Sequence, residues 1–491
     1  MRKWLIFAAA LCLLLSGCGP TVQPEPTPTP TAAPQPEAAE FALAWYPGAS
    51  LHPITGDNRT NLTLGGLLYE GLYELDGQFQ PEPCLCTGGT ASEDGLSWTF
   101  PLRSGVTFSD GSPLTAAEAA ASLELARTSP LYSARLADIT GVAAGEGSVT
   151  LTLSRPNGAL PALLDIPIVK ETGGAPLGTG PYVLTGEGEG AALTARADWW
   201  KGAEPPLEAI PLRPIQEADD LIHAFDTRDV ALVATDLTGT NALGFSGTFD
   251  TVDYPTSTML YVGFNTSSGP CRSTEVRQAL NRAFDRASIA TVLYARHAQA
   301  AALPVSPASP LYQADVAAEL EYDPQAAAEL LEQAGRQDLA LTLLAPADNP
   351  ARTAAAELLA DGLENLGLSV TLDLLPWPDY LAALERGDFD LYLGEVRLTA
   401  DFDLTALLAG ALNYGGYADE EALQRLDSFC AASGQGRDLS ARRLYQRLAE
   451  EPPFAVLCFK NWSVLTQWSR IQGLSPTQSN VFHAFDQWVL T

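Results

Sequence analysis

The chain has 491 residues and carries 28 lysines and arginines against 59 aspartates and glutamates, a formal net charge of −31 at pH 7. So acidic a chain excludes nucleic acid and anionic membrane surfaces as natural partners. The part that follows the N-terminal leader, about 450 residues, is too long for one compact core and should divide into lobes.

Residues 1–17 are predicted to be a signal peptide. Arg2 and Lys3 precede an apolar run from Trp4 to Leu15, which is too short to span a hydrocarbon layer of about 30 Å. The alternative, a buried helix, is disfavoured because a proline-rich tract follows directly. The sequence Leu-Ser-Gly-Cys ending at Cys18 resembles the lipobox of bacterial lipoproteins, which implies cleavage before Cys18 and lipidation of its thiol. We therefore expect a body outside the cytoplasm, lipid-anchored to the cell membrane.

Residues 18–40 are predicted to be a linker that carries this anchor. The tract is rich in Pro, Thr, Gln, Glu and Ala and shows no apolar periodicity. It cannot form a core, and its prolines favour extended polyproline II conformation. At about 3.1 Å per residue it would hold the body on the order of 60 Å from the membrane. The alternative interpretation is that a recognition domain of another protein binds this proline-rich tract.

The cysteines and histidines do not form a recognisable metal motif. Five cysteines remain after the leader and the lipidation site, an odd number, so at least one thiol lacks a partner within the chain. Cys84 and Cys86 are only two residues apart in an expected strand, which is poor geometry for a mutual disulfide. The four histidines are widely scattered. We predict no metal site and no cofactor.

The stretch from Gly95 to Arg127 carries the strongest local signals. Apolar residues alternate from Leu96 to Leu102, as in a half-buried strand, and Ser109–Pro113 supplies turn chemistry. Thr115 then has Glu118 three residues on, a capping box that opens an alanine-rich helix. Over more than thirty positions this strand, turn and helix resemble the signature region of the family 5 extracellular solute-binding proteins, the peptide- and nickel-type receptors of ABC importers.

The resemblance implies an α/β, two-lobed periplasmic-binding-protein-like fold of the class II type, with an extra small sub-lobe and crossover strands between the lobes. It assigns 41–64, 165–258 and 462–491 to lobe I, 65–164 to sub-lobe Ib and 259–461 to lobe II. Gly178–Tyr182 and the helix Ser273–Arg286 match further family landmarks. Independently, strands at 339–344 and 368–374 flank a helix at 353–366, a βαβ pattern that predicts a parallel pair.

Met259–Thr266 resembles the family segment that crosses between the lobes, and Tyr261 and Asn265 are the predicted hinge residues. In peptide-binding members an aspartate in an Ala-Asp-Tyr segment bonds the ligand's α-ammonium group. Ala400-Asp401-Phe402 matches this segment once a two-residue insertion is allowed, so Asp401 is the candidate anchor; the other interpretation is an ordinary loop acid. Arg397 could receive a ligand carboxylate through a bidentate fork.

Four more ligand residues are proposed, each with a plainer alternative. Trp377 matches a family cleft tryptophan but could equally pack lobe II. Asp57 and Arg59 fall in a segment that resembles one wall of the peptide cleft, or else belong to a solvated loop. Tyr132 resembles a tyrosine that contacts bound peptide, although half of such loop tyrosines only pack.

These features predict a monomeric substrate-binding component of an ABC importer that captures short peptides by hinge closure and delivers them to a permease complex. Nickel-chelate or haem uptake and peptide sensing are the alternatives within the same fold. A hydrolase is the competing class, but the sequence has no Gly-x-Ser-x-Gly elbow, P-loop or dinucleotide fingerprint. We therefore expect a binding protein and not an enzyme.

Overall fold

The computed structural model describes residues 40–240, 242–246, 248–467 and 471–490. The predicted signal peptide, Cys18 and all but the last residue of the linker lie outside the described residues. Glu40–Thr491 forms one compact unit. Among the described helices, none combines the length and the apolar character needed to cross a membrane.

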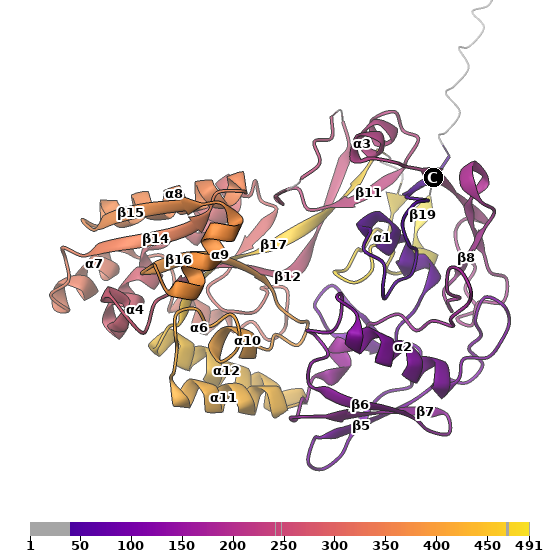
Figure 1. Cartoon of the computed structure of the whole chain (residues 1–491), viewed down its shortest axis with the longest axis horizontal. Coiled ribbons are helices and arrows are strands. Elements are labelled where there is room, and N and C mark those ends of the chain that lie inside the picture. The colour runs from indigo at the N-terminus through magenta and orange to yellow at the C-terminus, as the bar shows by residue number, and fades with distance from the viewer. Residues whose placement is uncertain (1–39, 241, 247, 468–470, 491) are drawn as a thin grey trace, which may run out of the picture. The chain divides into compact units, whose positions relative to one another are not determined.

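A seven-stranded sheet runs through the middle of this unit (Figure 1). Its order is β11-β17-β12-β16-β14-β15, and β13 also pairs with β17. The strands are β11 (Leu232–Thr235), β12 (Asp250–Phe264), β13 (Ala298–Ala300), β14 (Ala340–Pro346), β15 (Ser369–Leu375), β16 (Leu391–Arg397) and β17 (Phe454–Thr466). The long antiparallel pair β12 and β17 crosses from the lobe at the right of Figure 1 to the lobe at the left.

Helices cover both faces of the sheet in the second lobe. Leu260 and Val262 of β12 face a core formed with α4 (Thr274–Ala283), α7 (Pro324–Gln333) and α8 (Pro350–Asn365). Met259 and Tyr261 face the opposite core, as the period-two alternation of a strand requires. That core is formed with α6 (Ala314–Ala318), α9 (Trp377–Arg386), α10 (Thr405–Leu408), α11 (Glu420–Ala431) and α12 (Gly434–Glu450).

The first lobe and its sub-lobe share one large core. The first lobe contains the sheet β1-β10-β9-β8, in which β1 and β10 are parallel, and the sub-lobe contains the antiparallel sheet β4-β5-β7-β6. The elements are β1 (Leu43–Trp45), α1 (Arg59–Leu68), β2 (Tyr73–Leu75), β3 (Pro81–Pro83), β4 (Thr90–Ala91), β5 (Ser97–Pro101), α2 (Ala116–Thr128), β6 (Ile139–Ala144), β7 (Ser148–Leu153), β8 (Tyr182–Thr185), β9 (Ala192–Ala195), β10 (Ala209–Pro214), α3 (Ala218–Asp226), β18 (Ile471–Gln472) and β19 (Val489–Leu490). The division at 64/65, 164/165, 258/259 and 461/462 stays a prediction, because residues on both sides of the first two boundaries belong to this one core.

The local sequence signals correspond closely to these elements. Trp98 and Phe100 of β5 are buried, and Thr115 is the N-cap of α2 as predicted. Ser273 caps α4, its hydroxyl accepting a hydrogen bond from the backbone N–H of Val276. Strands β14 and β15 are parallel and flank α8, so the βαβ prediction is confirmed.

The crossover strands are longer than the sequence pattern predicts. The expected strand Met259–Thr266 corresponds to the second part of β12, which begins at Asp250 and ends at Phe264, and its partner β17 runs from Phe454 to Thr466. The reason is that each strand passes from one packing environment into another. Six consecutive residues of β12 from Met259 to Phe264 are buried, whereas its first half is partly exposed, so no single alternation marks the whole strand.

The Gly178–Tyr182 landmark lies against the end of α1. The backbone N–H of Gly180 donates to the carbonyl oxygen of Leu68 over 3.0 Å. A Cβ atom at Gly180 would come within 2.6 Å of the Leu68 carbonyl carbon, and one at Gly178 within 2.0 Å of the Leu68 oxygen. These glycines are therefore required by close backbone approach.

We predict that Gly180→Ala lowers the free energy of unfolding by about 1–3 kcal/mol, because backbone atoms cannot move aside as a flexible side chain can. Gly173→Ala is the matched control, since an added Cβ there meets nothing within 4 Å. The control should leave stability unchanged or raise it by up to about 1 kcal/mol. Chemical unfolding measures both; equal stabilities in the two variants would contradict the packing argument.

Candidate functional site

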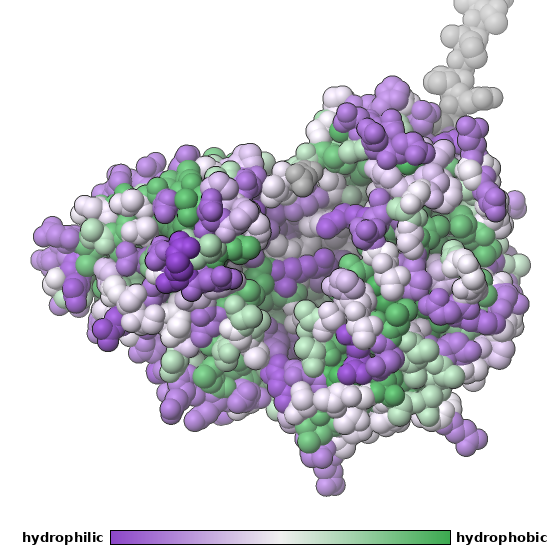
Figure 2. Space-filling view, in the orientation of Figure 1, coloured by the Kyte–Doolittle hydropathy of each residue, from purple (hydrophilic) through white to green (hydrophobic). Residues whose placement is uncertain are grey.

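Charged and aromatic side chains from both lobes meet between the lobes, where Figure 2 shows the surface hollowed. Arg59 opens α1 of the first lobe, and Arg397 ends β16 of the second. Both side chains are exposed. A charged residue is tolerated at each of these two positions, because α1 and β16 leave the core there.

Arg59 and Arg397 have no carboxylate partner in the described part of the chain, although they lie close enough to repel each other. The Arg59 guanidinium stacks over the Trp462 ring, 4.2 Å from its centroid. Desolvation by surrounding protein lowers the pKa of Arg59, and the charge of Arg397 lowers it further. Desolvation also lowers the pKa of Arg397, opposed by Tyr254 and Tyr132. Asp236 and Tyr254 act in the opposite direction on the pKa of Arg59. Guanidinium groups that are not held in an ion pair are suited to binding an anion.

Arg135 adds a third cation, which the sequence analysis missed. Burial lowers its pKa to about 10, with Arg397 contributing in the same direction and Tyr132 and Asp401 opposing. Its guanidinium lies 5.7 Å from the centre of the Tyr132 ring, pairs with Asp165 and donates to the carbonyl oxygen of Leu163. No motif surrounds Arg135 in the sequence, so only its place in the fold identifies it.

Tyr132 lies on the wall of this region. Its hydroxyl donates to the carbonyl oxygen of Pro53 over 3.4 Å, and burial raises its pKa. Tyr132 influences Arg397 in the other lobe. The structure therefore brings together three of the six predicted ligand residues, Arg59, Tyr132 and Arg397.

Asp401 lies at the same junction but is only 4 % exposed. One carboxylate oxygen accepts a hydrogen bond from the side-chain amide of Asn157 over 2.9 Å, and the other accepts from Thr399 over 2.5 Å. The Asp401 carbonyl oxygen accepts from Arg437. A ligand ammonium group would have to replace Asn157, which belongs to the sub-lobe side. Its role as the anchor stays a prediction.

Further contacts tie the sub-lobe to the second lobe beside Asp401. Arg155 pairs with Asp403 and also donates to Asp138 over 2.7 Å. The rings of Phe79 and Phe402 meet edge to face with centroids 5.2 Å apart. These contacts hold the two bodies together at a place distinct from the crossover strands.

A buried lysine joins the lobes at the crossover itself. Lys460 of β17 is 1 % exposed. Its ammonium nitrogen lies 2.8 Å from Asp236, which follows β11, and 3.5 Å from Glu395 of β16. One carboxylate belongs to each lobe, so this ammonium group is fixed between them.

The predicted hinge residues lie deeper, inside the second lobe. Tyr261 is 3 % exposed and packs edge to face on Tyr392, with centroids 5.7 Å apart. The Asn265 amide donates to the carbonyl oxygen of Phe389 over 3.0 Å. Their role as the hinge stays a prediction.

Asp57 and Trp377 differ from the residues above. Asp57 is exposed and makes no hydrogen bond or ion pair with described residues. Trp377 is 45 % exposed, stacks on Tyr380 and lies under the Arg352 guanidinium. Arg352 donates to Thr240 of the first lobe over 3.3 Å, which places Trp377 beside another contact between the lobes.

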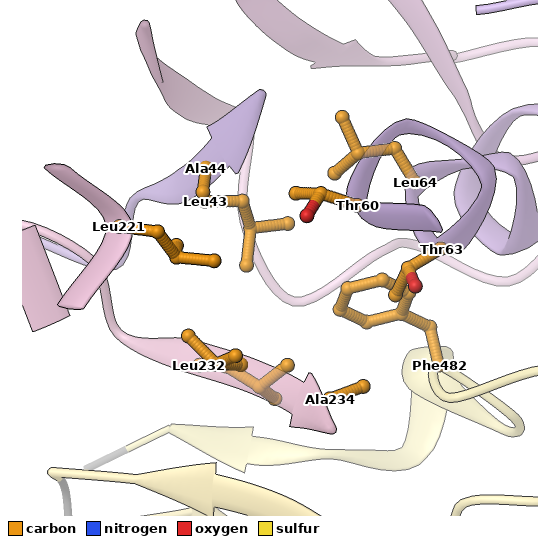
Figure 3. A pocket seen from close by; sticks show the side chains of 10 residues that line it. Leu43, Ala44, Thr60, Thr63, Leu64, Leu221, Leu232, Ala234 and Phe482 are labelled. Atoms are coloured by element: carbon orange, nitrogen blue, oxygen red, sulfur yellow. The ribbon is translucent and has the colours of Figure 1, made fainter. Parts of the chain in front are cut away.

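The cavity in Figure 3 is too small for a peptide. It lies inside the first lobe, has a volume of about 30 Å³ and is lined by side chains from β1, α1, α3 and β11, with Phe482. Ligand sites usually measure about 300–1,000 Å³. A wider, open hollow of about 780 Å³ runs along α2 beside His52 and Glu171. Neither hollow includes the arginines of the junction.

Comparison with known proteins places this chain in a family. Residues 80–412 match the family described as "Bacterial extracellular solute-binding proteins, family 5 Middle". The chain belongs to that family, which is a binding family and not a catalytic one.

Among curated relatives, the glutathione-binding protein GsiB of Salmonella typhi is 28% identical over 309 residues, which cover 59% of this chain and 60% of the relative. GsiB of Escherichia coli K12 is 26% identical over 305 residues, covering 58% and 59%. The chain thus matches about three fifths of the length of these relatives.

Solved structures confirm the predicted two-lobed α/β fold. HbpA2 from Haemophilus parasuis superposes with a TM-score of 0.76 at 20% identity, covering 92% of this chain and 99% of the other. The murein tripeptide-binding protein MppA, in its unliganded open form, gives 0.73 at 20% identity and covers 92% and 98%. NikA from Brucella suis in complex with Fe(III)-EDTA gives 0.70 at 20% identity and covers 92% and 100%.

We predict that Arg155→Met lowers the free energy of unfolding by about 1–3 kcal/mol, because it leaves the partly buried Asp403 carboxylate without its cation. Arg127→Met is the control, since Arg127 pairs within α2 with the more exposed Glu124 and should cost less than about 0.5 kcal/mol. Urea unfolding compares them. A loss of similar size in both variants would contradict a specific inter-lobe role for Arg155.

Proposed function

We propose that this protein is the substrate-binding component of an ABC importer, lipid-anchored at Cys18 on the outer side of the cell membrane. It works as a monomer, captures a short peptide between its lobes and delivers it to a membrane permease. Membership of a solute-binding family and the two-lobed fold support the class of function. The leader and linker composition supports the anchor.

One observation carries the choice of ligand: Arg59 and Arg397 come from different lobes, lie close enough to repel each other and form no ion pair with described residues, while Asp236, the acid whose charge acts on Arg59, is paired with Lys460. Each repels the other, so an open arrangement of the lobes is favoured until an anion enters. A peptide's terminal carboxylate between the two guanidinium groups would replace that repulsion by charge-assisted hydrogen bonds. The same ligand would then hold the lobes together.

The opposite end of the ligand is assigned to Asp401. In the conformation described here Asn157 satisfies one of its oxygens. Separation of the lobes would free that oxygen for a peptide's α-ammonium group. Tyr132 would contact the ligand's backbone or side chain, with Trp377 and Asp57 toward the edge of the site. Closure would be accommodated at Tyr261 and Asn265.

Glutathione is the second candidate, because it fits the charges of the junction. It has two carboxylates and one ammonium group, and the junction supplies the unpaired cations Arg59 and Arg397 with the acid Asp401, while the third cation, Arg135, is paired with Asp165. The GsiB relatives are named as glutathione-binding proteins. A nickel chelate or haem, or a purely sensory role in peptide detection, are the remaining possibilities within this family.

We predict that Arg397→Gln raises the dissociation constant for glutathione or trialanine about 10- to 100-fold, because a hydrogen bond to a charged group contributes about 1.5–3 kcal/mol. Arg386→Gln is the control: Arg386 ends α9, is exposed and pairs with Asp388. Calorimetry measures both. Peptides with an amidated C-terminus should bind the two variants equally; an unchanged affinity of Arg397→Gln for free peptide would contradict the assignment.

We predict that Asp401→Asn removes the preference for a free ammonium group. Trialanine should bind the unmodified protein at least about tenfold more tightly than N-acetyl-trialanine, and the variant should bind the two peptides equally. Competition titration gives the ratio. If the variant keeps the preference, the ammonium group is bound elsewhere.

Mass spectrometry of the ligand that the purified protein retains identifies the substrate class most directly. A short peptide supports the proposal, glutathione supports the second candidate, and a metal chelate or haem overturns both. Ligand addition should also raise the melting temperature without consumption of the ligand, since only the folded state binds.

A further inference from the structure

A compact group of metal-binding side chains lies in the first lobe, on elements other than those of the arginine junction. Glu70 follows α1, Glu74 lies in β2, and Cys84 follows β3. One carboxylate oxygen from each glutamate and the Cys84 sulfur all lie within 4.8 Å of one another. The Cys84 thiol donates to a Glu74 carboxylate oxygen over 3.1 Å.

Glu70 is buried, and only one of its two carboxylate oxygens accepts hydrogen bonds. It is 6 % exposed. Its Oε2 accepts hydrogen bonds from the Thr179 hydroxyl over 2.8 Å and from the Trp200 indole N–H over 2.6 Å. Its Oε1 is buried and accepts no hydrogen bond from the described residues, and among them its charge is met only by the Lys201 ammonium nitrogen at 3.4 Å. Because buried carboxylate oxygens are normally hydrogen-bonded, this oxygen marks a position that a cation occupies.

The ammonium group of Lys201 neutralises only one of the two negative charges of Glu70 and Glu74. Its nitrogen lies 3.0 Å from Glu74 and 3.4 Å from Glu70, so one cation faces two carboxylates. The Lys201 side chain is 32 % exposed and lies over the Trp199 and Trp200 rings. It can therefore move into solvent. Its departure would open a path from the surface, where the Glu74 side chain is also 32 % exposed.

We propose that Glu70, Glu74 and Cys84 form a binding site for a zinc ion, with Lys201 holding the cation position in its absence. One thiolate and two carboxylates are ligand types that zinc accepts, and a water molecule would complete four-coordination. Binding would release the thiol proton of Cys84 and move the Lys201 ammonium group outward. The three anionic ligands, the zinc ion and the displaced lysine then sum to zero charge.

The test is a zinc titration of the purified protein by calorimetry, with melting temperature as a second measurement. We expect one zinc ion per chain and a higher melting temperature. Cys84→Ser should weaken binding at least about tenfold, since loss even of an outer-shell partner costs 10- to 100-fold. Cys86→Ser is the matched control: this buried thiol donates to the Leu72 carbonyl oxygen and lies outside the group.

Lys201→Met separates a metal site from a purely internal ion pair. A metal site predicts tighter zinc binding in this variant, because the competing cation is gone, and recovery of any lost stability on addition of zinc. Cobalt substitution should give a thiolate-to-metal charge-transfer band that is absent in Cys84→Ser. Should Cys84→Ser fail to fold, Glu74→Gln takes its place. Absence of zinc binding, or binding unaffected by Cys84→Ser and Glu74→Gln, overturns the proposal.

Discussion

The antiparallel pairing of β12 with β17 is the constraint on which the two-lobed structure depends. The other strands of the seven-stranded sheet join this pair directly or through β16 and β14. The pair carries the Lys460 ammonium group between Asp236 and Glu395, one from each lobe. A buried ammonium group is stable only with its carboxylates in place, so the position of the lobes is coupled to an electrostatic contact in the sheet itself.

The junction between the lobes combines attraction and repulsion. Asn157 with Asp401 and Arg155 with Asp403 connect the sub-lobe to the second lobe. Arg59 and Arg397 oppose that contact, because two like charges from different lobes lie near each other and neither forms an ion pair with described residues. A receptor that binds an anionic group gains from this balance, since the ligand supplies the missing negative charge and shifts the population toward the closed form.

The sequence was most informative where structure is local. The N-caps Thr115 and Ser273 and the βαβ unit around α8 were predictable because capping and periodicity involve neighbouring residues. It was least informative where residues far apart in the chain meet. Arg135 and Asn157 carry no local signal, and their proximity to Arg397 and Asp401 depends on the closing of two lobes.

The metal-binding group around Cys84 was not predicted for the same reason, because its residues come from separate segments of the chain. Metal motifs are recognised by short spacings, whereas Glu70, Glu74, Cys84 and Lys201 come from a turn, two hairpin segments and a distant loop. All five described cysteines are free and buried, which the odd count alone did not determine. The resemblance to the family identified Trp377 as a candidate ligand residue. It could not predict the contact of Trp377 with Arg352.

The register of the crossover strands has a consequence for dissection of the protein. Tyr254 of β12 pairs with Trp462 of β17, so the chain enters and leaves the second lobe at adjacent points. The second lobe is topologically an inserted domain whose two ends are already side by side. Excision would leave β11 still paired with the end of β17, and that end still paired with the beginning of β12. A reporter domain joined across the same pair would be sensitive to the twist between the two strands.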